Sequence, residues 1–263
     1  MTKKIVIANN YYNTYDELYH YGVKGMKWGV RRYQDKNGRL TPSGKKHYKD
    51  YGDGRIEIEK GAELQRLVGD GHKTELKGMT YASVRNSDNQ RYIKTLTGPF
   101  GARDTKLTLT TNTKLISPST SEASSIFFKT LKNDPKLNEA YSKTPLQMGK
   151  KYKDKELEDL ISGKNKKAYQ EYQVANSQFM FDESMGAIRT AYFNNLKKAG
   201  YNILRDENDI GSGYAKTPII ILDSEISVSL KSSEVITKAM KKDAKNYVKQ
   251  YKKHGEEWAD QFG

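Results

Sequence analysis

The chain has no cysteine among its 263 residues and carries only four histidines and six prolines. The absence of cysteine excludes disulfide bonds, thiolate catalysis and cysteine-ligated zinc, and it is compatible with folding in a reducing cytosol. The histidines stand far apart, at positions 20, 47, 72 and 254. This scatter indicates neither a histidine metal cage nor a Ser-His-Asp triad. We therefore expect no metal site and no redox chemistry.

Long apolar runs are also missing. No stretch approaches the roughly 20 apolar residues of a membrane span. The first apolar run, Ile5 to Ala8, is too short for the core of a signal peptide. We expect neither membrane insertion nor secretion by a signal peptide.

Positive charge is abundant. Lys and Arg number 46 against 32 Asp and Glu, which gives a formal net charge of +14. This charge favours polyanionic surroundings such as nucleic acid, an acidic shell protein or a membrane surface. The lysines alternate with acidic residues in places, as in KYKDKELEDL at 151–160, and such mixing is typical of a solvated helix face. Non-specific contact with nucleic acid stays an open alternative.

The order of sequence patterns predicts an α+β protein. A basic arm at 1–54 includes a short helix at 42–50, one mixed α/β domain follows at 55–230, and a charged helix at 231–263 ends the chain. That last helix should carry a thin apolar stripe of Val235, Ala239, Ala244 and Val248. Alternating or apolar runs predict strands at 55–59, 62–68, 79–84, 106–116, 201–204 and 217–222.

The expected helices have recognisable starts. Ser87 is placed to cap a helix carrying Tyr92 and Leu96, and Ser119-x-x-Glu122 is a capping-box pattern. A helical insertion follows at 134–198. Its aromatic residues are expected to pack in the core rather than to stack on a ligand; they are Tyr169, Tyr172, Phe179 and Phe181.

The segment from Tyr19 to Arg32, YHYGVKGMKWGVRR, differs from the rest of the arm. Glycines punctuate a basic core in which Lys24, Lys27, Arg31 and Arg32 alternate with apolar residues. Trp28 has the character of an interface anchor, because Trp and Arg are enriched where proteins bind one another. A loosely ordered basic tail is the alternative.

This segment resembles the HxGxKGMKWGxRR segment of phage and prophage proteins from Gram-positive bacteria, where it precedes varied domains. The resemblance covers Tyr19 to about Tyr48 and includes GRLTPSGKKHY. It implies a portable tag for virion association that binds phage head or portal proteins through residues 19–32. The implied location is the virion and the cytoplasm of the host bacterium.

Polar residues gather on the expected strands of the main domain and in the loops between them. They are Arg66, Thr80 to Ser83, Asp88 with Tyr92, and Asp206 to Asp209. Nucleotide and hydrolase signatures such as GxxxxGK[ST], GxGxxG after a strand, HExxH and GxSxG are absent.

From Gly61 to Asp223 the domain resembles an ADP-ribosyltransferase. The resemblance implies that NAD is the substrate, that Arg66 binds its phosphates, and that Tyr81 and Ser83 hold nicotinamide and its ribose. The family also uses an acidic residue late in its sequence to activate the transfer. The resemblance assigns this catalytic role to Glu207, with Glu225 as the alternative. The sequence departs from the family in having TYAS for the serine-threonine-serine strand.

Each of these residues also has an ordinary structural interpretation. DENDIGSG is typical of a polar strand connection, Arg66 suits a strand-edge ion pair, and Ser83 suits a surface hydroxyl. Three functions stay open: a virion-carried effector that modifies a host protein, a non-enzymatic minor head or internal protein, and a host-directed binding protein or inhibitor.

Overall fold

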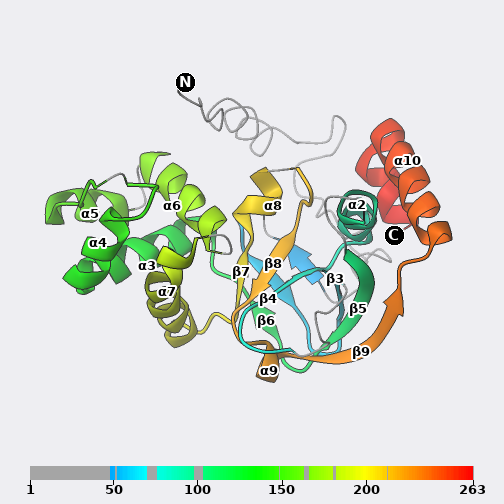
Figure 1. The fold of residues 1–263 in the computed structure, drawn as a ribbon, viewed down its shortest axis with the longest axis horizontal. Coiled ribbons are helices and arrows are strands. Elements are labelled where there is room, and N and C mark those ends of the chain that lie inside the picture. Colours follow the sequence, from blue (N-terminus) through cyan, green and yellow to red (C-terminus); the bar gives the residue numbers. More distant parts are fainter. Residues whose placement is uncertain are drawn as a thin grey trace, which may run out of the picture.

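The computed structural model describes residues 48–50, 52–69, 76–97, 103–147, 149–162, 166–179, 182–211 and 213–262. These residues form the expected α+β fold (Figure 1). The arm with its segment 19–32 lies outside them, apart from its end. There Tyr48–Asp50 is strand β1, so the helix expected at 42–50 does not reach residue 50. No helix in the described ranges is long and apolar enough to cross a membrane.

A small antiparallel sheet has the order β1-β2-β6, with β2 at Ile56–Ile58 and β6 at Leu115–Ile116. The turn between β1 and β2 requires glycine at position 54. Gly54 has φ +94°, and a Cβ there would lie 2.2 Å from Thr120 Oγ1. The turn also accepts a hydrogen bond from the backbone of Thr120 at Asp53 O, 3.0 Å away. It therefore places the first helix after β6 against the small sheet.

The larger sheet has six strands in the order β7-β8-β4-β3-β5-β9, and every neighbouring pair is antiparallel. Its strands are β3 (Glu63–Gly69), β4 (Thr80–Ser83), β5 (Arg103–Thr111), β7 (Ile203–Arg205), β8 (Pro218–Ile221) and β9 (Val228–Val235). All four residues of β8 are buried, as its unbroken apolar run predicts. The strands expected at 62–68, 79–84, 201–204 and 217–222 are confirmed.

Two expected boundaries are wrong because tertiary pairing overrides local pattern. The single strand expected at 106–116 breaks after Thr111, and its two parts join different sheets. The helix expected from residue 231 begins at Lys238 as α10 (Lys238–Phe262), since 228–235 pair with β5. Val235 is accordingly 68% exposed on β9, and Ala239 is exposed on α10, whereas Ala244 and Val248 are buried.

Two local expectations also need correction. Helix α2 (Asn86–Leu96) starts without a side-chain cap, and Ser87 lies buried inside it. The polar connection after β7 contains the short helix α8 (Glu207–Gly211). A further short helix, α9 (Ser224–Ser227), leads into β9.

A helical unit separates β6 from β7 in the sequence and lies to one side of the sheets (Figure 1). It starts earlier than the predicted residue 134, because α3 is part of the same core. The capping box of α3 is confirmed: Ser119 Oγ accepts a hydrogen bond from Glu122 N at 3.2 Å. Its elements are α3 (Thr120–Asn133), α4 (Pro135–Ser142), α5 (Asp154–Ile161), α6 (Lys166–Gln178), the 3-10 turn η1 (Glu183–Met185) and α7 (Gly186–Lys198).

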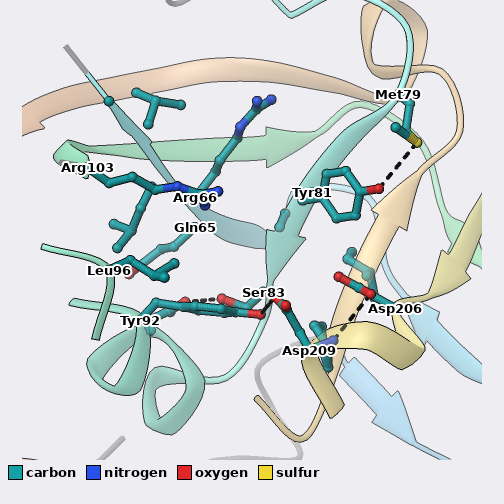
Figure 2. A pocket seen from close by; sticks show the side chains of 17 residues that line it. Gln65, Arg66, Met79, Tyr81, Ser83, Tyr92, Leu96, Arg103, Asp206 and Asp209 are labelled. Atoms are coloured by element: carbon teal, nitrogen blue, oxygen red, sulfur yellow. Dashed lines mark hydrogen bonds between the residues drawn. The ribbon is translucent and has the colours of Figure 1, made fainter. Parts of the chain in front are cut away.

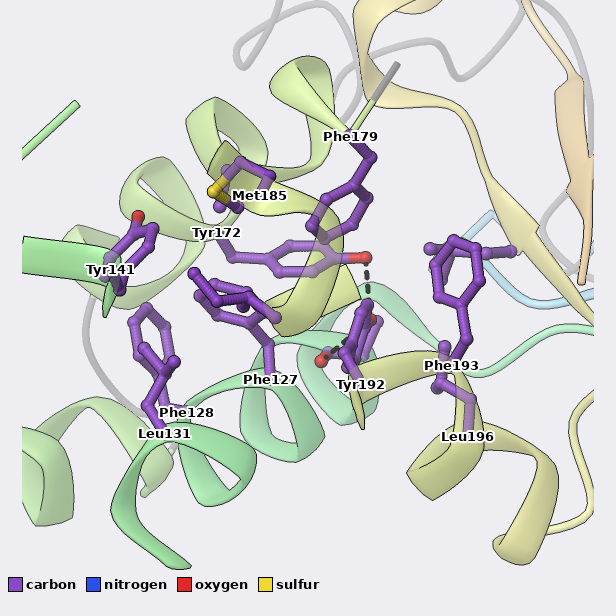
Figure 3. Packing of buried hydrophobic residues seen from close by; sticks show 14 of the residues in the cluster. Phe127, Phe128, Leu131, Tyr141, Tyr172, Phe179, Met185, Tyr192, Phe193 and Leu196 are labelled. Carbon is purple, nitrogen blue, oxygen red and sulfur yellow. Dashed lines mark hydrogen bonds between the residues drawn. The ribbon is translucent and has the colours of Figure 1, made fainter. Parts of the chain in front are cut away.

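Aromatic rings form the centre of this unit (Figure 3). Phe127 is fully buried, and its ring centroid lies 5.2–6.2 Å from those of five other rings. These belong to Phe128, Tyr141, Tyr172, Phe179 and Tyr192. The expected core role of Tyr172 and Phe179 is confirmed, while Tyr169 is half-buried and Phe181 lies outside the described residues.

Helices α2 and α10 pack together on the other side of the large sheet (Figure 1). Ile93 of α2 and Ala244 of α10 are buried with Leu67 of β3 and Ile236. Arg91 of α2 lies over the ring of Tyr251, 4.5 Å from its centroid. The apolar face of α10 is therefore covered by α2.

Replacing Phe127 by Ala should lower the free energy of unfolding by about 3–5 kcal/mol, because the cavity would remove ring contacts on all sides. Urea unfolding followed by circular dichroism measures this change. The control is Ile226→Ala on α9, where the side chain is 68% exposed and the expected change stays within about 0.5 kcal/mol. A loss below about 1 kcal/mol for Phe127→Ala would show that this ring is not the centre of the core.

Candidate functional site

A pocket lies where two neighbouring strands separate. β3 and β4 pair at Gln65 and Ser83, whereas β3 pairs with β5 along its length and β4 pairs with β8 at four positions. The pocket has a volume of about 240 Å³ and opens between these strands, α2 and α8 (Figure 2). Its polar lining residues are Gln65, Arg66, Tyr81, Ser83, Asn89, Tyr92, Arg103, Asp206 and Asp209.

Two arginines form one side of the pocket. Arg66 comes from β3 and Arg103 from the start of the adjacent β5. Arg66 Nη1 donates a hydrogen bond to Thr80 Oγ1 at 3.0 Å. Burial lowers the pKa of Arg66, and the positive charge of Arg103 lowers it further. Within the described residues neither guanidinium forms an ion pair with a carboxylate. Two partly buried cations facing one cavity favour a bound anion such as phosphate.

Two aspartates line the pocket on the side away from the arginines, where β7 leads into α8. Asp206 follows β7, and its Oδ1 accepts hydrogen bonds from the backbone N–H groups of Asn208 and Asp209 at 3.0 and 3.4 Å. Burial raises the pKa of Asp206 to about 8, and the charge of Asp209 contributes to the increase. Asp209 Oδ2 accepts a hydrogen bond from the Tyr92 hydroxyl at 2.5 Å. The turn therefore presents one carboxyl that retains a proton near neutral pH beside a second that is held by a tyrosine.

Tyr81 and Ser83 project from β4 into the pocket between these charged groups (Figure 2). Burial raises the pKa of Tyr81, and so does the nearby Asp206, so the phenol keeps its proton. Ser83 donates a hydrogen bond to Asn89 Oδ1 of α2 and is almost fully buried. Asp88, grouped with Tyr92 by the sequence, accepts hydrogen bonds from the backbone of Lys216 and Thr217 at 2.9 Å. It fixes α2 to the segment before β8 and does not line the pocket.

The two predicted acids lie elsewhere. Glu207 is buried, and its side chain points to the helical unit, where Oε2 accepts a hydrogen bond from Gln173 Nε2 at 3.0 Å. Its Oε1 lies 3.7 Å from Arg205 Nε. Glu225 is exposed on α9. Neither residue lines the pocket, so the structure brings Arg66, Tyr81 and Ser83 together without either acid.

The pocket contains functional groups to which the sequence assigned no role. Asp206 and Asp209 flank the predicted acid, and their i, i+3 spacing would have placed them on one helix face had α8 been expected. Arg103 has no comparable signal, because it joins the pocket only through the pairing of β5 with β3. The predicted partner-binding residues lie outside the described residues; they are Lys24, Lys27, Trp28, Arg31 and Arg32. Within the described ranges no three His, Asp or Glu side chains gather as metal ligands.

The fold and pocket thus define an α+β protein with a cavity, lined by two arginines and two aspartates, at a split in an antiparallel sheet. In comparison with known proteins, the model of a family of unknown function (DUF7211) matches residues 13–35. The matched range contains the segment from Tyr19 to Arg32 and ends before the described domain. No curated protein and no solved structure matches the chain.

Replacing Asp206 by Asn should remove a pH dependence of stability. Because the pKa of Asp206 is raised to about 8 in the folded protein, the native state keeps a proton that the unfolded chain releases above its ordinary pKa of about 4. The stability of the wild type should therefore fall as pH rises from about 4 to about 8, by at most about 1.4 kcal/mol per pH unit from this group.

Urea unfolding at several pH values in that window measures the difference between the wild type and Asp206→Asn. The matched control is Asp159→Asn, which changes an exposed aspartate of α5 and should leave the slope unchanged. Parallel pH profiles for the wild type and Asp206→Asn would contradict a protonated Asp206.

Proposed function

We propose that the domain is an ADP-ribosyltransferase-like effector that binds NAD in the β3–β4 pocket and modifies a host protein. The observation that carries the proposal is the convergence of Arg66, Tyr81 and Ser83 in one cavity. The family resemblance assigns a role to each of these three residues, which lie on two strands, β3 and β4. A random set of strand residues would point to both faces of a sheet.

The chemistry of the lining suits a dinucleotide. Arg66 and Arg103 would bind its phosphates through their planar donor groups. The Tyr81 ring offers a flat face for nicotinamide. The cavity of about 240 Å³ is below the range of about 300–1,000 Å³ for whole ligand pockets. It therefore suits the nicotinamide, ribose and phosphate half, with the adenosine half outside it.

The acid role falls to a different residue from the one assigned by the resemblance. NAD would supply an ADP-ribosyl group with nicotinamide as the leaving group, and positive charge would develop on the ribose. A carboxylate in the pocket stabilises such charge. Asp209 suits this role because it lines the cavity and is oriented by Tyr92, whereas Glu207 is held by Gln173.

The first test measures the release of nicotinamide from NAD, in the presence of host lysate, by the full chain and by its variants. Arg66→Ala should weaken NAD binding by at least about 30-fold, because it removes a buried charge-assisted contact. Asp209→Asn should lower turnover by about 100-fold with little change in binding. Lys106→Ala is the matched control, because Lys106 lies on β5 and pairs with Glu234 outside the pocket.

The outcomes separate the open functions. Wild-type protein that neither binds nor consumes NAD would reject the enzyme. Binding without turnover would favour a host-directed binding protein with the same pocket. Loss of turnover in Glu207→Gln with Asp209→Asn unaffected would return the acid role to Glu207.

We further propose that residues 19–32 attach the protein to a phage head or portal protein, so that it travels in the virion into the host cytoplasm. The confinement of the family match to residues 13–35 supports a segment that is independent of the domain. Deleting residues 19–32 should abolish recovery of the protein in purified particles while its circular dichroism spectrum keeps the folded signal. Trp28→Ala should lower recovery more than Val23→Ala, because Trp is enriched and Val under-represented among the residues that dominate binding energy at interfaces. Undiminished recovery of the deletion variant would reject the attachment role.

A further inference from the structure

Helix α10 carries an uninterrupted row of lysines along one flank. Between Lys238 and Gly255 the helix has seven lysines and one carboxylate, Asp243. The spacing repeats every three or four residues, which places them on one side of an α-helix. We call this surface the lysine stripe; it consists of Lys238, Lys241, Lys242, Lys245, Lys249, Lys252 and Lys253.

The stripe lies beside the packed side of the helix and is open to solvent. Ala244, Val248 and Tyr251 are buried, while six of the seven lysines are exposed and Lys241 is half-buried. Lys241 Nζ donates a hydrogen bond to Thr97 O at the end of α2, at 3.2 Å. The stripe is also separate from the pocket, to which α10 contributes no lining residue.

Among the described residues, no carboxylate pairs with this row. In the part of the chain that the structure describes, no stripe lysine forms an ion pair. The helical unit differs: Lys132 pairs with Glu158 at 2.7 Å, and Lys151 pairs with Glu139 at 3.1 Å. The mixing of lysines with acids that the sequence shows at 151–160 is thus absent from the lysine stripe.

The arrangement disfavours the isolated helix. Like charges at i, i+4, such as Lys238 with Lys242 and Lys245 with Lys249, cost about 0.2–0.5 kcal/mol per pair. The first turn of α10 contains no acidic residue, and lysines there oppose the helix dipole. A polyanion bound to this surface would neutralise the lysines and remove the repulsion that lowers the stability of the helix.

We propose that the lysine stripe binds the phosphate backbone of a nucleic-acid duplex without reading its sequence. The stripe runs for about 22 Å at 1.5 Å per residue, which spans about six base pairs of DNA. A membrane surface fits less well, because binding there buries an apolar helix face and that face of α10 is covered by α2. Lysines at the flank, with no exposed aromatic residue among them, contact phosphates rather than base edges.

The test measures binding of the full chain to short random-sequence duplexes of DNA and RNA by fluorescence anisotropy, from about 50 to 200 mM salt. The variant replaces Lys242, Lys245 and Lys249 together by Gln. The control replaces Lys136, Lys155 and Lys198 of the helical unit by Gln, because these lysines are exposed and form no ion pair with another described residue. Both variants change the net charge equally and keep the basic arm.

The stripe variant should bind at least about 10-fold more weakly at low salt, and the slope of log K against log salt should become shallower by about 3. The control should change affinity less than about 2-fold. Circular dichroism should show an intact fold in both, since Gln is a good helix former. NAD turnover in the stripe variant should equal that of the wild type, which separates this surface from the pocket.

Three results would overturn the proposal. The first is an equal loss of affinity in the two variants, which would reflect net charge alone. The second is binding to vesicles of phosphatidylglycerol and phosphatidylcholine that exceeds duplex binding and depends on the stripe. The third is competition by polyglutamate as effective as competition by DNA at equal charge. Tighter binding to the DNA duplex or to the RNA duplex would show which nucleic acid the stripe prefers.

Discussion

The separation of β3 from β4 beyond the Gln65–Ser83 pair is the constraint on which the candidate site depends. Neighbouring strands of an antiparallel sheet normally bond along their whole length and leave no room between them. Here each strand takes its other neighbour as the main partner, β5 for β3 and β8 for β4. Side chains that project beside the split therefore face a cavity, with Arg66 on one wall and Tyr81 on the other.

The turn after β7 depends on a second constraint, the direction in which each carboxylate points at the start of helix α8, which Asp206 immediately precedes. Successive residues of a helix are rotated by about 100°, so Asp206 and Asp209 share a face while Glu207 points elsewhere. Asn176 of α6 makes two hydrogen bonds to the backbone of this turn. Its Oδ1 accepts from Glu207 N at 3.0 Å, and its Nδ2 donates to Arg205 O at 3.1 Å. The helical unit thereby holds the turn so that its two aspartates face the pocket.

Positive charge is used differently in different parts of the fold. Several lysines of the helical unit, such as Lys132 and Lys151, pair with glutamates, and such exposed pairs contribute little to stability. The pocket arginines and the lysine stripe have no such balance among the described residues. At both places a bound anion would relieve repulsion between groups of like charge.

The sequence by itself determined the α+β class, the buried strand β8, the capping box at Ser119 and three residues of the pocket. The first three follow from local spacing, which sets which side of a strand or helix a residue occupies, whereas the pocket residues Arg66, Tyr81 and Ser83 come from the resemblance to ADP-ribosyltransferases. Only the tertiary structure decided that Asp209 rather than Glu207 lines the pocket, that Arg103 lines it with Arg66, and that 228–235 form a strand. Those outcomes depend on which strands pair and which helices pack together, and contacts between residues far apart in the chain leave no periodic signal in the sequence.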